Sequence, residues 1–273
     1  MKELTIRIIV AVFGIPVFAF AVLKGELYFF VLVVLMSGIG QWEMYDLLQK
    51  KEAIAQRIPG ILVGFILLYT VYFGMNIWAV ISIAALLLII FSKEMFLNQG
   101  SANLNSSATF IAVIYPTLFL SSLLYLRENV SFMIPGTQAN EAGYYILTMI
   151  VSVWGCDTFA YFFGKQFGRH PLFKRVSPNK TIEGAIAGVL GAVFVFFLVD
   201  WVGLLEIPLN LKLVSGFLVG IFGQLGDLVE SWLKRDAGVK DSSNLLPGHG
   251  GILDRFDSLS FIAPAFLILY LLW

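Results

Sequence analysis

One stretch of the chain, residues 231–257, concentrates charged side chains and glycines between two long apolar runs. Its carboxylates could bind a hard cation, and its lysines and arginines could neutralise phosphate groups. The residues of both kinds are Asp236, Asp241, Asp254, Asp257, Lys234, Arg235, Lys240 and Arg255. A chain this apolar does not need so many charges in one loop for solubility alone. We therefore predict that this loop carries the chemistry.

The segment just before this loop is predicted to be a helix with one polar face. Asp227, Glu230, Ser231 and Lys234 follow one another at spacings that place them on the same side of a helix. A carboxylate deep in a membrane costs about 2.5–3.5 kcal/mol on insertion scales, so Asp227 should face a bundle interior or a bound cation. Neutralisation by a neighbouring lysine is the alternative. Because more carboxylates follow, we favour the cation.

The acidic residues indicate magnesium rather than a softer metal. One cysteine and two histidines make a zinc site improbable. Carboxylate oxygens suit magnesium, which keeps several waters and commonly completes its shell with substrate phosphates. A second cation is left open. The predicted metal ligands are Asp227, Asp241, Asp254 and Asp257.

The glycines of residues 247–251 could form a phosphate-binding loop. Gly250 and Gly251 would let backbone amides approach an anion closely, with Lys240 on one side and Arg255 on the other. Most glycine clusters only mark turns, and for His249 a simple turn role is as well supported as a direct one.

A second group of polar residues lies between residues 157 and 184. Asp157 stands inside an apolar run, where a carboxylate is expensive unless it is used or paired. Pro178 predicts a turn, and Thr181 should cap the helix that follows. A capped helix beside a basic membrane anchor is the alternative to a substrate site. The predicted substrate-binding residues here are Asp157, Lys165, Ser177, Lys180, Thr181 and Glu183.

Two more carboxylates, Glu43 and Asp46, stand near the end of the second apolar run. Their spacing of three places them on one helical face. A structural role and a role in a substrate cavity are equally compatible with this position.

The elements that must position these residues are membrane helices. The chain has 273 residues, of which 59% are hydrophobic and 13% charged, with a mean hydropathy of +0.86. This composition predicts an all-α polytopic membrane bundle with about nine spans. The third and fourth runs could form a helical hairpin or one broken span. The runs are 4–23, 27–48, 59–75, 77–92, 108–126, 143–164, 182–203, 211–230 and 258–273.

Charge patterning predicts the orientation of this bundle. With a cytoplasmic N-terminus and nine spans, 15 of the 18 basic residues fall on the cytoplasmic side. Such a bias follows the positive-inside rule and places the C-terminus outside. Both polar groups then lie at the cytoplasmic interface. Glycine pairs such as Gly216 and Gly220 are interpreted as helix packing within the molecule.

Residues 231–257 resemble the signature of the phosphatidate cytidylyltransferases, in the order Ser-x-Leu-Lys-Arg, Lys-Asp, Pro-x-His-Gly-Gly and Asp-Arg-Phe-Asp. The elements Ala-Tyr-x-x-Gly-Lys and Ser-Pro-x-Lys-Thr-x-Glu-Gly of residues 160–184 are also similar to that family. The resemblance implies conversion of CTP and phosphatidic acid to CDP-diacylglycerol and pyrophosphate, with a divalent cation, in a cell membrane.

That resemblance also implies roles for the residues. Residues 108–273 would form the catalytic bundle, and residues 1–107 would supply about four further spans. No nucleic-acid partner is expected, and a homodimer is left open. The catalytic residues would be Asp227, Lys234, Arg235, Lys240, Asp254 and Arg255. Substrate contacts would include Ser231, His249, Gly250 and Gly251, besides the residues of the second group.

Two alternatives remain on the sequence alone. A CTP-dependent polyprenol or lipid kinase would transfer the terminal phosphate instead of a cytidylyl group. An ion or solute transporter would use Asp157, Asp227 and Glu230 to line a pathway. Transport does not require a basic, glycine-rich loop, which favours the enzyme.

Overall fold

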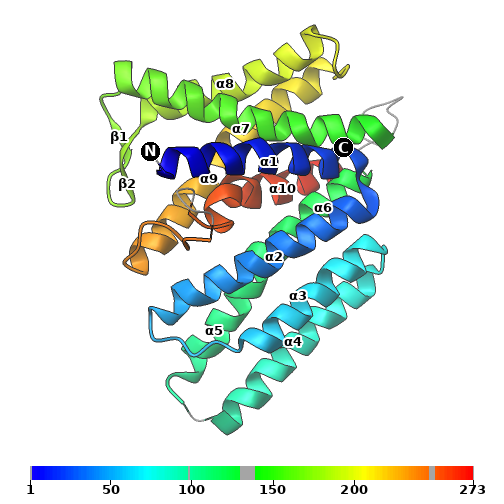
Figure 1. Ribbon diagram of the computed structural model, residues 1–273, viewed down its shortest axis with the longest axis vertical. Coiled ribbons are helices and arrows are strands. Elements are labelled where there is room, and N and C mark those ends of the chain that lie inside the picture. The colour runs from blue at the N-terminus through cyan, green and yellow to red at the C-terminus, as the bar shows by residue number, and fades with distance from the viewer. Residues whose placement is uncertain (1, 98, 130–138, 246–249, 273) are drawn as a thin grey trace. The chain divides into compact units, whose positions relative to one another are not determined.

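The computed structural model describes residues 2–97, 99–129, 139–245 and 250–272, and within them it is almost entirely helical. Figure 1 labels these helices in chain order. They are α1 (Lys2–Lys24), α2 (Glu26–Gln49), α3 (Arg57–Tyr72), α4 (Asn76–Leu97), α5 (Ala102–Val113), η1 (Ile114–Leu118), α6 (Phe119–Asn129), α7 (Ala139–Phe167), α8 (Ile182–Trp201), α9 (Leu209–Asp236) and α10 (Leu253–Leu272).

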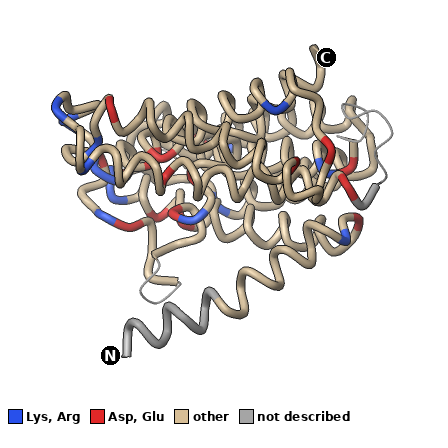
Figure 2. The backbone as a smooth tube through the Cα atoms, turned by 90° about the horizontal axis from the view of Figure 1, so that it is seen from above, with Lys and Arg blue, Asp and Glu red and all other residues tan. Residues whose placement is uncertain are grey.

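Each predicted apolar run coincides with a helix, when α5, the π-helical turn η1 and α6 are taken together as residues 102–129. In the described residues, seven of these helices are long and apolar enough to cross a membrane, whereas α3 and the part of α1 from Val12 onward are shorter. Long uncharged lengths of helix separate the charged positions (Figure 2). The all-α, multi-pass fold class is therefore confirmed.

Contacts divide the chain into two compact units, each assembled from several segments. The predicted division of the chain at residue 107, into N-terminal spans and a catalytic bundle, stays a prediction, because contacts between residues do not test function. Unit 1 comprises Met1–Phe18, Glu26–Tyr125 and Leu233–Phe256. Unit 2 comprises Ala19–Gly25, Leu126–Trp232 and Asp257–Trp273.

In unit 1, α3 and α4 run side by side as a helical hairpin, which settles the choice between a hairpin and one broken span (Figure 1). Val63 of α3 packs on Leu86 and Ile90 of α4 and on Val113 of α5. The π-helical turn contains Pro116, whose ring and missing N–H disturb the regular α-helical ladder. Next to it, Thr117 Oγ1 accepts a hydrogen bond from Gln41 Nε2 of α2 at 2.7 Å.

In unit 2, glycines bring α7, α8 and α9 into close contact. A Cβ on Gly220 of α9 would lie 2.6 Å from the Cα of Val189 in α8, and one on Gly216 would lie 2.5 Å from the Cα of Val193. Only a residue without a side chain allows the backbones to approach this closely. The interpretation of this glycine pair as packing within the molecule is confirmed.

A short antiparallel hairpin of β1 (Pro171–Phe173) and β2 (Ser177–Thr181) connects α7 to α8. The predicted turn at Pro178 is wrong, since Pro178 lies within β2 and the chain reverses at residues 174–176. A two-stranded hairpin has only edge strands, which tolerate a proline. The predicted cap is confirmed, because Thr181 Oγ1 accepts a hydrogen bond from the Gly184 amide at 3.2 Å.

Candidate active site

The centre of the polar residues in unit 2 is an ion pair between Asp227 of α9 and Lys180 of β2. Ser231, one helical turn beyond Asp227, donates a hydrogen bond to its Oδ1 at 3.2 Å. Asp157 of α7 is exposed and lies within electrostatic reach of both charges. The structure thus brings together four of the residues that the sequence singled out. Lys180 pairs with Asp227, so a cation at Asp227 would have to compete with this lysine.

The base of the β-hairpin is tied to the start of α8 by Glu183. Its Oε2 accepts the amide of Arg169 at 3.1 Å, and its Oε1 lies 2.6 Å from His170 Nδ1. Thr181 caps the same helix. Glu183 and Thr181 therefore fix the strand that carries Lys180. Sequence reasoning missed His170, which no spacing rule connects with Glu183.

Two other predicted substrate residues of unit 2 lie nearby in the chain but are not joined to this ion pair. The Lys165 ammonium lies 5.9 Å from the centre of the Tyr161 ring and is exposed. Ser177 begins β2 and pairs with Phe173 in the hairpin. Both side chains remain accessible to a ligand.

In unit 1, Asp254 in the first turn of α10 forms a second lysine–aspartate pair. Its Oδ1 lies 2.5 Å from Lys234 Nζ of α9, and both side chains are largely buried. Its Oδ2 accepts hydrogen bonds from the Gly251 amide at 2.7 Å and from the Ser242 amide at 2.9 Å. A cation at Asp254 would have to exchange with one of these donors.

The remaining charged residues of the loop face outward. Arg235, Lys240, Asp241 and Arg255 are exposed, and Arg235 donates to the Val239 carbonyl at 3.0 Å. His249 lies outside the described residues.

Asp257, in unit 2, accepts the amide of Ser258 at 2.5 Å. A Cβ on Gly226 of α9 would lie 2.5 Å from the Asp257 carbonyl oxygen, so α9 and α10 approach closely at this point.

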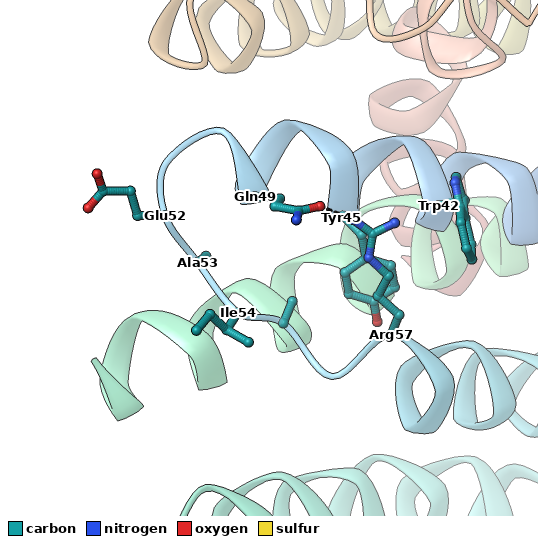
Figure 3. Close-up of a pocket in the computed structure, with 8 residues that line it drawn as sticks. Trp42, Tyr45, Gln49, Glu52, Ala53, Ile54 and Arg57 are labelled. Atoms are coloured by element: carbon teal, nitrogen blue, oxygen red, sulfur yellow. Dashed lines mark hydrogen bonds between the residues drawn. The ribbon is translucent and has the colours of Figure 1, made fainter. Parts of the chain in front are cut away.

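Unit 1 also contains an open pocket of about 610 Å³ around the connection between α2 and α3 (Figure 3). The Arg57 guanidinium lies 5.0 Å from the centre of the Trp42 ring and forms an ion pair with Asp46 at 2.7 Å. Sequence reasoning left the role of Asp46 open, and the structure places it in this ion pair at the surface. Glu43, on the same helix, lies instead in the interior beside the loop.

The donors fit magnesium bound mainly through its substrate. Within the described ranges, no three acidic, histidine or cysteine side chains gather around one point. Magnesium commonly needs only one or two protein carboxylates when phosphates supply further oxygens. Asp227 with Asp157 nearby offers such a donor set in unit 2, and Asp254 offers a single carboxylate in unit 1.

Comparison with known proteins gives the class of the chain. Residues 5–273 match the cytidylyltransferase family. The chain therefore belongs to this family and is a nucleotidyltransferase, in agreement with the prediction of an enzyme rather than a transporter.

Its relatives include proteins with a more specific name. The phosphatidate cytidylyltransferase of Bacillus subtilis (strain 168) is 34% identical over 267 residues, 97% of this chain and 96% of that protein. That of Staphylococcus saprophyticus is also 34% identical, over 97% of this chain and 98% of the relative. That of Staphylococcus haemolyticus is 46% identical over 154 residues, 55% of this chain.

Proposed function

We propose that this chain is a phosphatidate cytidylyltransferase, which converts CTP and phosphatidic acid to CDP-diacylglycerol and pyrophosphate in phospholipid biosynthesis. The observation that carries the proposal is the similarity, over 97% of the chain, to relatives of that name. The multi-pass fold supports it, because a membrane-embedded enzyme can act on a substrate whose acyl chains stay in the bilayer.

The reaction needs charge neutralisation more than a base. A phosphomonoester has a second pKa of about 6, so the lipid phosphate is mostly dianionic at neutral pH and already nucleophilic. Its oxygen attacks the α-phosphorus of CTP, and the bond from that phosphorus to the pyrophosphate oxygen breaks. Two anions must meet and a third must leave, which requires positioned cations. Lys180 and Lys234 are the best-positioned candidates, and the exposed side chains of Lys165, Arg235, Lys240 and Arg255 add positive charge.

Magnesium belongs to the proposal. Asp227 and Asp254 would each offer it a carboxylate, with Asp241 and Asp257 as further predicted ligands and a second cation left open. When bound, magnesium would offset the negative charge of the phosphates. A steep dependence of activity on added magnesium, abolished by chelation and restored by excess metal, is the expected result.

We further propose that the chain lies in the cell membrane with its active site at the cytoplasmic face. The basic residues support this orientation, since 15 of the 18 fall on one side of a nine-span topology. A reporter fused after Trp273 should be found outside, and a cytoplasmic reporter would refute the nine-span topology. Cross-linking of the purified protein tests whether it forms a homodimer.

The experiment that tests the function uses CTP labelled at two positions. Detergent-solubilised protein is incubated with phosphatidic acid, magnesium and CTP labelled at the α- or γ-phosphate. Cytidylyl transfer places only the α label in the lipid, whereas a lipid kinase would place only the γ label there. Failure of the α label to enter the lipid would refute the proposed activity.

The same assay tests the predicted role of Asp254. Asp254→Ala should lose nearly all cytidylyl transfer. Asp236→Ala is the matched control, because the Asp236 side chain lies at the surface in an ion pair with Lys51 at 3.4 Å. An Asp254→Ala enzyme as active as the Asp236→Ala enzyme would refute the role given to Asp254.

A further inference from the structure

Glu43 on α2 is a buried carboxylate surrounded by hydrogen-bond donors from the loop before α10. The residue is 2% exposed. Its two oxygens accept hydrogen bonds from Ser243 Oγ at 2.6 Å, Leu253 N at 2.8 Å, Ile252 N at 3.0 Å and Ser242 Oγ at 3.1 Å. All four donors lie at least 199 positions further along the chain. Glu43 therefore joins α2 to this loop.

The donors explain why a carboxylate stands at this position. The first amides of a helix have no partner within the helix and are usually satisfied by a serine, threonine, aspartate or asparagine just before it. Here that place is taken by Ile252, which has no polar side chain. Glu43 supplies the missing acceptor from another helix, and the positive end of the α10 dipole favours its charge.

A continuous polar network runs from Glu43 to the lysine–aspartate pair of unit 1. The Ser242 hydroxyl lies 3.1 Å from Glu43 Oε2 and 2.8 Å from Asp254 Oδ2. Asp254 in turn holds Lys234 through its other oxygen. A change in the position of Glu43 would therefore be transmitted to the carboxylate and the ammonium that the proposed reaction uses.

Gly250 and Gly251 make room for the carboxylates of Asp254 and Glu43. A Cβ on Gly251 would lie 2.5 Å from Glu43 Oε2 and closer still to Oε1 and to the Ser242 hydroxyl. Gly250 has a φ of +79°, and a Cβ there would lie 2.6 Å from Asp254 Oδ2. The sequence predicts that these two glycines belong to an anion-binding loop. In the structure, their lack of side chains also leaves space for the carboxylates of Glu43 and Asp254.

We propose that Glu43 is a positioning residue for cytidylyl transfer. It fixes residues 242–243 and 252–253 so that Asp254 and Lys234 are held for the substrate, without itself touching the reacting atoms. The proposal rests on the proposed function. It gives α2, which lies in the part of the chain outside the predicted catalytic bundle, a direct part in organising the site.

The test compares Glu43→Gln with Asp46→Asn in the full-length, detergent-solubilised enzyme. Glutamine has nearly the shape of glutamate, but an NH₂ group replaces one carboxylate oxygen. This group cannot accept the two hydrogen bonds that the oxygen accepts in Glu43. We expect kcat for Glu43→Gln to fall at least about tenfold, with the KM for CTP changed less than about threefold. Asp46→Asn lies one helical turn away, removes a charge of the same sign, and should stay within about twofold of wild type.

Rates are expressed per molecule of monodisperse protein, so that a purely structural role would lower yield or thermal stability but not kcat. Wild-type kcat in monodisperse Glu43→Gln would overturn the proposal. If Glu43→Gln does not fold, Ser242→Ala decides, since it removes the hydroxyl that bridges Glu43 and Asp254. A several-fold loss of kcat with unchanged KM supports the proposal, and full activity refutes it. A wild-type enzyme that transfers no cytidylyl group would instead refute the proposed function.

Discussion

Replacement of Gly251 by alanine should disrupt the loop, because the added methyl group would clash with neighbouring side chains. The new Cβ would occupy the space of the Glu43 carboxylate and the Ser242 hydroxyl. Both groups are buried, so they have little room to move aside. Glu43 would have to give up part of its contacts with Ile252 and Leu253.

The size of the effect follows from those contacts. A hydrogen bond to a charged group contributes about 1.5–3 kcal/mol. Loss of a single such bond at about 2 kcal/mol corresponds to roughly a 30-fold lower kcat/KM, if the energy is lost in the transition state. We expect at least this loss in the labelled-CTP assay, measured per molecule of monodisperse protein.

Gly38→Ala is the matched control, because Gly38 lies on the same helix as Glu43 and a Cβ there meets no atom within 4 Å. Alanine in a helix interior is favoured over glycine by about 0.5–1 kcal/mol, so this variant should be as active and at least as stable as wild type. Addition of Glu43→Asp to Gly251→Ala shortens the carboxylate and should restore part of the activity. Wild-type activity in Gly251→Ala would refute the steric reasoning.

Three further predictions follow from other contacts. Gly220→Leu should separate α8 from α9 and destabilise the protein by about 1–3 kcal/mol, seen as a lower thermal midpoint in detergent. Lys180→Met removes the ammonium that would compete with magnesium for the Asp227 carboxylate. It should lower the half-saturating magnesium concentration by up to about fivefold, while reducing kcat. A higher half-saturating magnesium concentration would contradict this competition. Asp236→Asn removes an exposed ion pair and should change the unfolding free energy by less than about 0.5 kcal/mol.

Much of the fold could be predicted because the bilayer imposes a simple rule on the sequence. Every apolar run of sufficient length must form a helix that satisfies its own backbone. The runs therefore coincide with helices even where no residue with a capping side chain precedes the helix, as at the start of α10. The wrongly predicted turn at Pro178 lies outside this rule, since in the short hairpin the pairing of Pro171 with Thr181 and of Phe173 with Ser177 determines where the chain reverses.

The site was predictable in its residue types but not in its pairings. The spacing of Asp227 and Ser231 placed them one turn apart on α9, and their hydrogen bond confirms it. No spacing rule could have paired Asp227 with Lys180, 47 positions away, or Glu43 with Leu253, 210 positions away. These contacts depend on which segments pack together. The signal that could have indicated a special role for Glu43 was the cost of a carboxylate inside an apolar run.

The two lysine–aspartate pairs bring together residues for which the sequence predicts separate roles, cation binding and phosphate neutralisation. The sequence predicts Asp227 and Asp254 as cation ligands and Lys180 and Lys234 as residues for the substrate phosphates, yet each aspartate pairs with one of these lysines. Pairing lowers the cost of keeping four charges beside a membrane, because an unpaired buried charge is far more expensive than a neutral pair. A magnesium–phosphate substrate carries the complementary charges, a cation for each carboxylate and an anion for each ammonium. In the proposed reaction, binding at either pair would thus exchange one set of ion pairs for another.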